Sequence, residues 1–170
     1  MNVIAESERK WPANLRGRAA EMRPAASPDW RTDLVSEILK FATAVVYADD
    51  VPATVAFYRR VTGLEPTYYD ADLGFALLGE EQTVAIASHE AGMLMLADGY
   101  GQARSNQVRG TELAFWTRDV AAAFQIAVEA GATPLTPPRV MPWGQTVAYV
   151  QAPEGTVLGF VTRVGEAAAP

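Results

Sequence analysis

Two distant stretches of the chain have the alternating apolar character of half-buried strands. The first, 42–48, reads ATAVVYA, and the second, 112–117, reads ELAFWT. Side chains of a strand point alternately to the two faces of a sheet. One face of each stretch is compact and apolar, as a face beneath a helix would be. The other face includes two large amphipathic side chains, Tyr47 and Trp116, and one charge, Glu112. Its residues are Thr43, Val45 and Tyr47 in the first stretch, and Glu112, Ala114 and Trp116 in the second.

The same helix signals follow both stretches. Asp50 and Asp119 each precede a valine, and aspartate is a favoured N-cap because its carboxylate accepts a hydrogen bond from the first free helix N–H groups. About a dozen residues later come Gly63 and Gly131, which suit the left-handed conformation that ends a helix. The repeated order of these signals predicts two copies of one structural unit.

Strand-like segments follow each predicted helix, and PEG at 153–155 reads as a turn. The segments are 67–70, 74–78, 83–87 and 92–97 after the first helix, and 133–136, 145–151 and 157–163 after the second. Each half therefore contains about one strand, one helix and three strands. Two such units predict an α+β fold with the helices on one face of antiparallel-rich sheets.

We expect the domain to span 39–164, with an N-terminal extension at 1–38 and a tail at 165–170. The extension mixes charge, proline and alanine, and 31–40 has the pattern of a short amphipathic helix. Two interpretations stay open: a loosely ordered arm, or an arm that packs on a partner subunit through Trp11, Trp30 and Leu34.

Composition narrows the function classes. The 170-residue chain has 49% hydrophobic and 20% charged residues, which is typical of one globular domain. The absence of cysteine excludes disulfides and thiolate metal sites. The net charge of −6, without a basic stripe, argues against nucleic-acid binding. No apolar run approaches the ~20 residues of a membrane span, and no signal-peptide core is present, so we expect a cytoplasmic protein.

The stretch VVYADDVPATVAFYRRVTGLEP resembles the opening strand and helix of the vicinal oxygen chelate superfamily, which includes glyoxalase I, extradiol dioxygenases and bleomycin-resistance proteins. LAFWTRDVAAAFQIAVEAGA resembles the start of its second module, and PWGQTVAYVQAPEGTVLGFV its closing segment. The resemblance covers about 41–164. It implies two βαβββ modules, about 41–98 and 111–164, whose curled mixed sheets surround a cleft, and it implies a homodimer.

The metalloenzymes of this superfamily hold a divalent metal with four side chains from the strands. The resemblance places these four positions at Thr43, near Met95, at Glu112 and at Gly159. Only Glu112 is a strong ligand for a hard cation, whereas a catalytic site typically needs about three protein ligands. We therefore predict no metal site and no cofactor. His89, the single histidine, is interpreted as a surface turn residue.

The metal-free members of the superfamily bind a small molecule in the cleft. By this resemblance the predicted ligand site comprises Thr43, Tyr47, Met95, Glu112, Trp116, Trp143 and Tyr149. The aromatic rings would stack on a cationic or aromatic ligand. The alternatives are that Tyr47 and Trp116 fill a core between sheets, and that Trp143 is a hydrophobic lid.

Three roles stay open for Glu112. It could pair with an internal donor such as Arg109, Tyr47 or Thr43; it could receive an amine, guanidinium or hydroxyl of a ligand; or it could act as a general base. The leading hypothesis is a metal-free small-molecule binder. The alternatives are a lyase, isomerase or dioxygenase with a divergent metal site, and a partner-binding protein that uses the N-terminal arm.

Overall fold

The computed structural model describes residues 41–81, 83–96, 100–102, 107–108 and 110–163. The predicted extension 1–38 with Trp11, Trp30 and Leu34, and the tail 165–170, lie outside the described residues. Within these ranges, no helix is long and apolar enough to cross a membrane.

Module one contains the first four strands and a helix that follows the first strand. In chain order these elements are β1 (Ala44–Ala48), α3 (Val51–Thr62), β2 (Pro66–Asp70), β3 (Phe75–Leu78) and β4 (Val84–Ser88). The strands form one sheet in the order β1-β4-β3-β2. A short helix, α4 (His89–Met95), leaves the end of β4.

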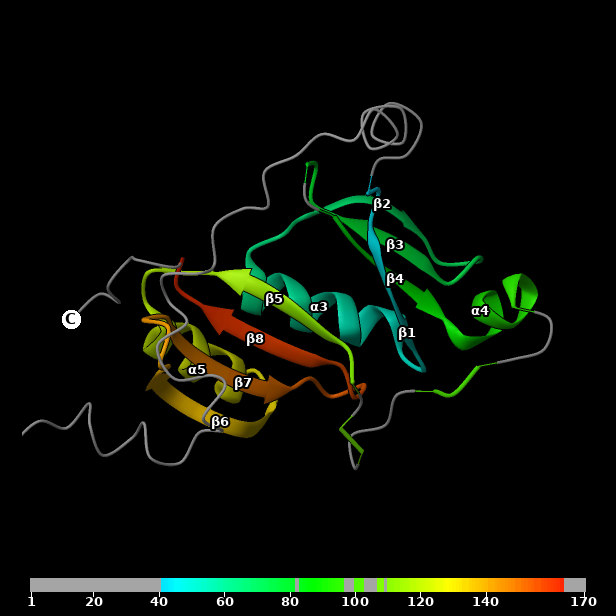
Figure 1. Ribbon diagram of the computed structural model, residues 1–170. Coiled ribbons are helices and arrows are strands. Elements are labelled where there is room, and N and C mark those ends of the chain that lie inside the picture. The colour runs from blue at the N-terminus through cyan, green and yellow to red at the C-terminus, as the bar shows by residue number, and fades with distance from the viewer. Residues whose placement is uncertain (1–40, 82, 97–99, 103–106, 109, 164–170) are drawn as a thin grey trace, which may run out of the picture.

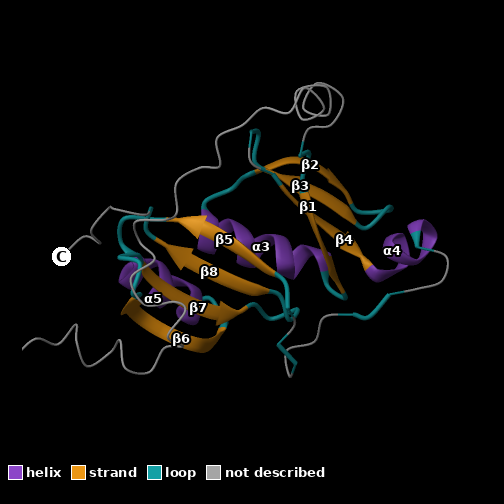
Figure 2. Ribbon diagram, viewed as in Figure 1, coloured by secondary structure: helices purple, strands orange, loops and turns teal. Residues whose placement is uncertain are grey.

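Module two repeats this order. Its elements are β5 (Glu112–Trp116), α5 (Val120–Glu129), β6 (Thr133–Val140), β7 (Thr146–Gln151) and β8 (Val157–Val161). The strands form a second sheet in the order β5-β8-β7-β6. The strand that opens each module pairs in parallel with the strand that closes it, β1 with β4 and β5 with β8. The other neighbouring strands are antiparallel. Two separate mixed sheets, each with its own helix, confirm the predicted α+β fold of two βαβββ modules (Figures 1 and 2).

Both predicted N-caps are present. Asp50 Oδ1 accepts a hydrogen bond of 2.8 Å from the Ala53 N–H, and Asp119 Oδ1 accepts one of 2.8 Å from the Ala122 N–H. Gly63 ends α3 with a φ of 72°, a conformation that costs other L-residues a steric clash with their Cβ. Asp50, Asp119 and Gly63 therefore mark helix ends as predicted. Gly131, with a φ of 106°, follows Ala130, the C-cap of α5.

One hydrophobic core continues from module one into module two. Its residues come from the helices and from the face of each sheet that lies under its helix, here called the helix face. The opposite face of each sheet is called the open face. The helices α3 and α5 also contact each other. At this junction the buried Tyr58 hydroxyl of α3 donates a hydrogen bond of 3.0 Å to Glu154 Oε1, in the turn between β7 and β8.

The predicted strand at 92–97 is wrong, because Gly92–Met95 belong to α4. Ser88 caps this helix, and its Oγ accepts a hydrogen bond of 3.1 Å from the Ala91 N–H. Gly92 is buried against two tyrosine rings, and a Cβ there would lie 2.9 Å from both Tyr100 Cε1 and Tyr47 Cδ1. The apolar residues that resembled a strand therefore serve a helix that packs beside the sheet.

The edge strand β6 is longer than predicted and reaches Val140. It contains Pro134, Pro137 and Pro138, which lack the N–H that a strand donates to its neighbour. Its pairing with β7 shifts register twice, between Pro134 and Thr136 and again between Thr136 and Arg139. An edge position tolerates these prolines because only one side of the strand must form hydrogen bonds.

Candidate functional site

Glu112 and Tyr149 meet above Gly159 on the open face of the second sheet. Gly159 pairs with Ala114 of β5 and with Tyr149 of β7, so it lies in the middle of the sheet. A Cβ added to Gly159 would lie 3.0 Å from Tyr149 Cε1 and 3.5 Å from Glu112 Oε1. The absence of a side chain at Gly159 therefore leaves room for a phenol ring and a carboxylate to lie together.

Tyr149 is subject to charges of both signs. Partial burial raises the pKa of its phenol, the Glu112 carboxylate raises it further, and the Arg139 guanidinium lowers it. The phenol therefore remains protonated at neutral pH and can donate a hydrogen bond. Glu112 itself is exposed at the start of β5, so the half-buried setting expected for its strand does not extend to this carboxylate.

Trp116 lies at the other end of β5 and is 61% exposed. The Arg163 guanidinium lies over its ring, with Cζ 3.9 Å from the ring centroid. One face of the indole is therefore already engaged by a cation of the same chain. A ligand that stacks on Trp116 must use the other face or displace Arg163.

Trp143 lies in the connection between β6 and β7. Its indole N–H donates a hydrogen bond of 2.6 Å to Gln145 Oε1, and the Gln145 amide donates one of 2.6 Å to the Thr162 carbonyl. The residue is half-buried, and this chain of hydrogen bonds ties the connection to the end of β8. Its assignment to a ligand site stays a prediction.

Three predicted site residues, Thr43, Tyr47 and Met95, belong to module one. The Thr43 hydroxyl faces the backbone oxygens of Thr83, at 3.1 Å, and Ala44, at 3.2 Å. The Tyr47 ring stacks on Tyr100, with the ring centroids 4.8 Å apart. Met95 is the last residue of α4 rather than part of a strand.

These contacts bear on the proposed internal partners of Glu112. Thr43 and Tyr47 are engaged in module one, and Arg109 lies outside the described residues. The structure therefore gives no support to a pairing of Glu112 with Thr43 or Tyr47. Its possible roles toward a ligand or a proton stay predictions.

The interpretation of His89 as a surface turn residue is wrong. Its side chain is only 15% exposed, and it begins α4 at the end of β4. One ring nitrogen, Nδ1, forms a hydrogen bond with the Tyr100 hydroxyl, and the other, Nε2, lies 3.6 Å from Asp49 Oδ1. The sequence alone did not reveal this contact, because it depends on the pairing of β1 with β4.

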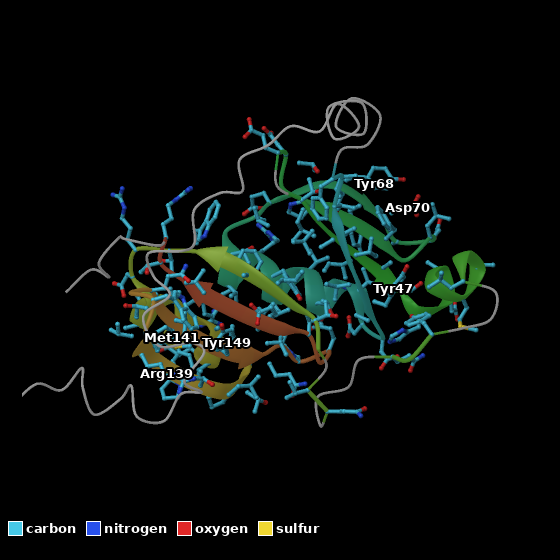
Figure 3. The ribbon with its side chains drawn as sticks, in the orientation of Figure 1. Tyr47, Tyr68, Asp70, Arg139, Met141 and Tyr149 are labelled. Carbon is cyan, nitrogen blue, oxygen red and sulfur yellow. The ribbon has the colours of Figure 1, made fainter. Side chains whose placement is uncertain are left out.

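The predicted site residues are thus divided between the two modules, and Met95 and Trp143 lie outside the strands. Figure 3 shows Tyr47 on the first sheet with Tyr68 and Asp70, and Tyr149 on the second with Arg139; Met141 directly follows β6. Of the labelled residues, sequence reasoning predicted Tyr47 and Tyr149 and missed the other four. It also missed the contacts of Asp49, His89 and Tyr100. The expected antiparallel pairing of the segments at 133–136 and 145–151 could have indicated that Arg139 lies near Tyr149, because β6 pairs with β7.

The part of the chain that the structure describes does not offer the ligand set of the metalloenzymes it resembles. Among the described residues, no group of three or more histidine, cysteine, aspartate or glutamate side chains could hold an ion. At the fourth ligand position, Gly159, the space for a side chain is bordered by the Tyr149 ring. A carboxylate introduced at Gly159 would therefore have to displace that ring before it could approach Glu112.

Comparison with known proteins agrees with this architecture. Residues 40–160 match the family model for the Glyoxalase/Bleomycin resistance protein/Dioxygenase superfamily. No curated protein sequence matches the chain.

Solved structures with the same fold share little sequence with the chain. A glyoxalase-related enzyme from Fulvimarina pelagi is 20% identical, with a TM-score of 0.64 over 73% of this chain and 88% of that one. A family enzyme from Burkholderia phytofirmans PsJN is 23% identical, with a TM-score of 0.60 over 71% and 95%. A superfamily member from Sphaerobacter thermophilus DSM 20745 is 23% identical, with a TM-score of 0.58 over 74% and 99%. At these identities the structures support the fold alone, and the family model carries the assignment: the chain belongs to the glyoxalase/bleomycin resistance protein/dioxygenase superfamily.

Proposed function

We propose that this protein is a metal-free small-molecule-binding member of the superfamily, with its ligand held against Glu112 and Tyr149. The observation that carries the proposal is the arrangement above Gly159. A phenol ring and a carboxylate lie there within contact distance of an added Cβ. Such an arrangement offers an apolar surface with a few placed polar groups, which is typical of small-molecule sites.

The charges around this site define what it would bind. The Glu112 carboxylate accepts hydrogen bonds from an amine, a guanidinium or a hydroxyl, and the protonated Tyr149 phenol donates one. The ring of Tyr149 provides a flat surface for an aromatic group. We therefore propose a ligand that combines a planar portion with a cationic or hydroxyl group.

A homodimer forms part of the proposal. The open faces carry large apolar side chains that are well exposed in one chain: Val45 is 42%, Tyr68 49% and Trp116 61% exposed. Burying such surface against a second copy would be favourable. It would also enclose Glu112 and Tyr149, which a single chain leaves partly open to water.

Metal analysis and ligand binding test the proposal together. Purified protein incubated with Zn²⁺ or Mn²⁺ and then desalted should retain no stoichiometric metal by mass spectrometry. Benzylammonium should shift the amide NMR signals of β5, β7 and β8 more strongly than its neutral counterpart, benzyl alcohol. E112Q should remove this preference and keep the fold, because the amide has the shape of the carboxylate without its charge.

The alternative of a metal-dependent lyase, isomerase or dioxygenase makes the opposite prediction. One retained ion for each chain, lost in E112Q, would contradict the metal-free proposal and favour that alternative. Equal shifts with benzylammonium and benzyl alcohol would show that Glu112 does not select a cation.

A further inference from the structure

Three titratable side chains come together at the carboxyl ends of β1 and β4, in module one. The two strands are parallel, and Ala48 pairs with Ser88 at their ends. The next residue along each strand is Asp49 in one case and His89 in the other. The strand pairing therefore places this carboxylate and this imidazole side by side.

His89 is hydrogen-bonded to Tyr100 and lies near the exposed carboxylate of Asp49. Its Nδ1 shares a hydrogen bond with Tyr100 Oη, and its Nε2 lies 3.6 Å from Asp49 Oδ1. A neutral imidazole with its proton on Nε2 directs that proton toward Asp49 and leaves Nδ1 free to accept the phenol proton. In this arrangement the hydroxyl is the nucleophile, the imidazole is its base and the carboxylate orients the imidazole.

Packing holds the Tyr100 ring in position. It stacks on Tyr47, with centroids 4.8 Å apart, and it lies 5.8 Å from the His89 ring by the same measure. Gly92 makes the approach possible, because a Cβ there would lie 2.9 Å from Tyr100 Oη. The phenol oxygen is therefore kept beside its base by contacts from β1 and α4.

We propose that Asp49, His89 and Tyr100 form an acid–base relay that makes Tyr100 an acceptor for acyl groups from small activated esters. Tyr100 Oη attacks the ester carbonyl carbon and forms a new C–O bond, while the phenol proton passes to His89 Nδ1. The bond from the carbonyl carbon to the leaving alkoxide or phenoxide breaks, and the electron pair departs with that group. The imidazolium that forms faces the Asp49 carboxylate.

The resting state of the phenol explains why a base is required. Burial raises the pKa of Tyr100, and the nearby Tyr47 and Asp49 raise it further. The phenol is therefore protonated at neutral pH, and its oxygen becomes a strong nucleophile only when the proton has an acceptor. Asp49 and His89 belong to module one and Tyr100 follows it, so the relay does not depend on a ligand at Glu112.

Acetylation by p-nitrophenyl acetate tests the relay within one molecule. Peptide mass spectrometry follows the acetyl group on Tyr100 and on Tyr69, which is 47% exposed and serves as the reference. Although Tyr100 is less accessible, its acetylation should be at least about tenfold faster, since a positioned base commonly contributes 10²–10⁴-fold. A rate at or below that of Tyr69 would overturn the proposal.

H89Q is the matched variant, because glutamine can accept the phenol hydrogen bond but cannot take up the proton. In H89Q the acetylation rate of Tyr100 should fall to that of Tyr69. A histidine with only a structural role would leave the Tyr100 rate unchanged, and an unchanged rate also overturns the relay. D49N should lower the rate less than H89Q. If H89Q fails to fold, the ratio of the acetylation rates of Tyr100 and Tyr69 in the unaltered protein decides alone.

Discussion

Tyr47 of module one and Trp116 of module two occupy equivalent positions, but their neighbours differ in charge. When the two strand registers are aligned, Asp49 of module one corresponds to Arg118 of module two. In the same way His89, after β4, corresponds to Arg163, after β8. Tyr47 stacks on Tyr100, which is hydrogen-bonded to the His89 imidazole, whereas Trp116 lies under a guanidinium. The same backbone plan supports a titratable cluster in one module and a basic one in the other.

The centres of the two open faces differ as well. Ala85 and Leu77 pair in module one where Gly159 and Tyr149 pair in module two. A methyl group is accommodated at Ala85, but the equivalent space at Gly159 is bordered by the Tyr149 ring. Strand pairing thus determines the position of a side chain. The identity of the paired residues, Ala85 and Leu77 or Gly159 and Tyr149, determines whether a polar site can form there.

The largest effect that distinguishes the modules is expected from G159V. The added methyl groups must displace the Tyr149 ring, and such overpacking costs about 1–3 kcal/mol of the free energy of unfolding. Urea denaturation measures this loss. In a Y149A background the same substitution should cost much less, because the space is already empty; an equal cost in both backgrounds would show that Tyr149 is not the obstacle.

A smaller effect is expected from E154Q at the junction of the modules. Burial raises the pKa of Glu154, so the folded state binds its proton more tightly than the unfolded chain does. This contribution to stability is complete below the ordinary carboxyl value of 4.5 and is lost as the pH rises through the raised pKa. E154Q should therefore raise the free energy of unfolding at pH 7 by about 1 kcal/mol.

Urea denaturation of E154Q between pH 4 and pH 8 should also show a weaker decline in stability as the pH rises. E81Q is the matched control, since Glu81 is exposed in the corresponding turn of module one. That control should change stability by less than about 0.5 kcal/mol. A decline with pH that is the same in E154Q and the unaltered protein would contradict the assignment to Glu154.

The smallest effect is expected from the ring contacts at the strand ends. A double-mutant cycle of W116L and R163Q should give a coupling free energy of about 0.5–1 kcal/mol. Because this contact is electrostatic and exposed, the coupling should decrease in 1 M salt. The corresponding cycle of Y47L and Y100L in module one should keep its value in salt, since that contact joins two uncharged rings.

Local signals in the sequence predicted most of the fold. Asp50, Asp119 and Gly63 act through hydrogen bonds and backbone angles within a few residues, so their roles could be read from sequence and are confirmed. The alternation in β1 and β5 likewise predicted which side chains face the helices. The end of module one was wrong because apolar residues at 92–97 suit a strand as well as a helix, and tertiary packing around Gly92 decides between them.

The candidate site was less predictable, because it depends on contacts between strands that are far apart in the sequence. The resemblance to the superfamily pointed to Glu112 and Gly159, and both lie on the open face of the second sheet. The environment of His89 was missed because it depends on the register of β1 with β4 and on Tyr100. Met95 was assigned to a strand position, and its place in α4 removes the basis for that assignment.

The prolines of β6 have a consequence for how this protein avoids uncontrolled association. A strand at the rim of a sheet normally exposes a row of N–H groups that can recruit a strand from another molecule and begin a fibril. Pro134, Pro137 and Pro138 interrupt that row. Edge-to-edge polymerisation at this rim of module two is therefore disfavoured.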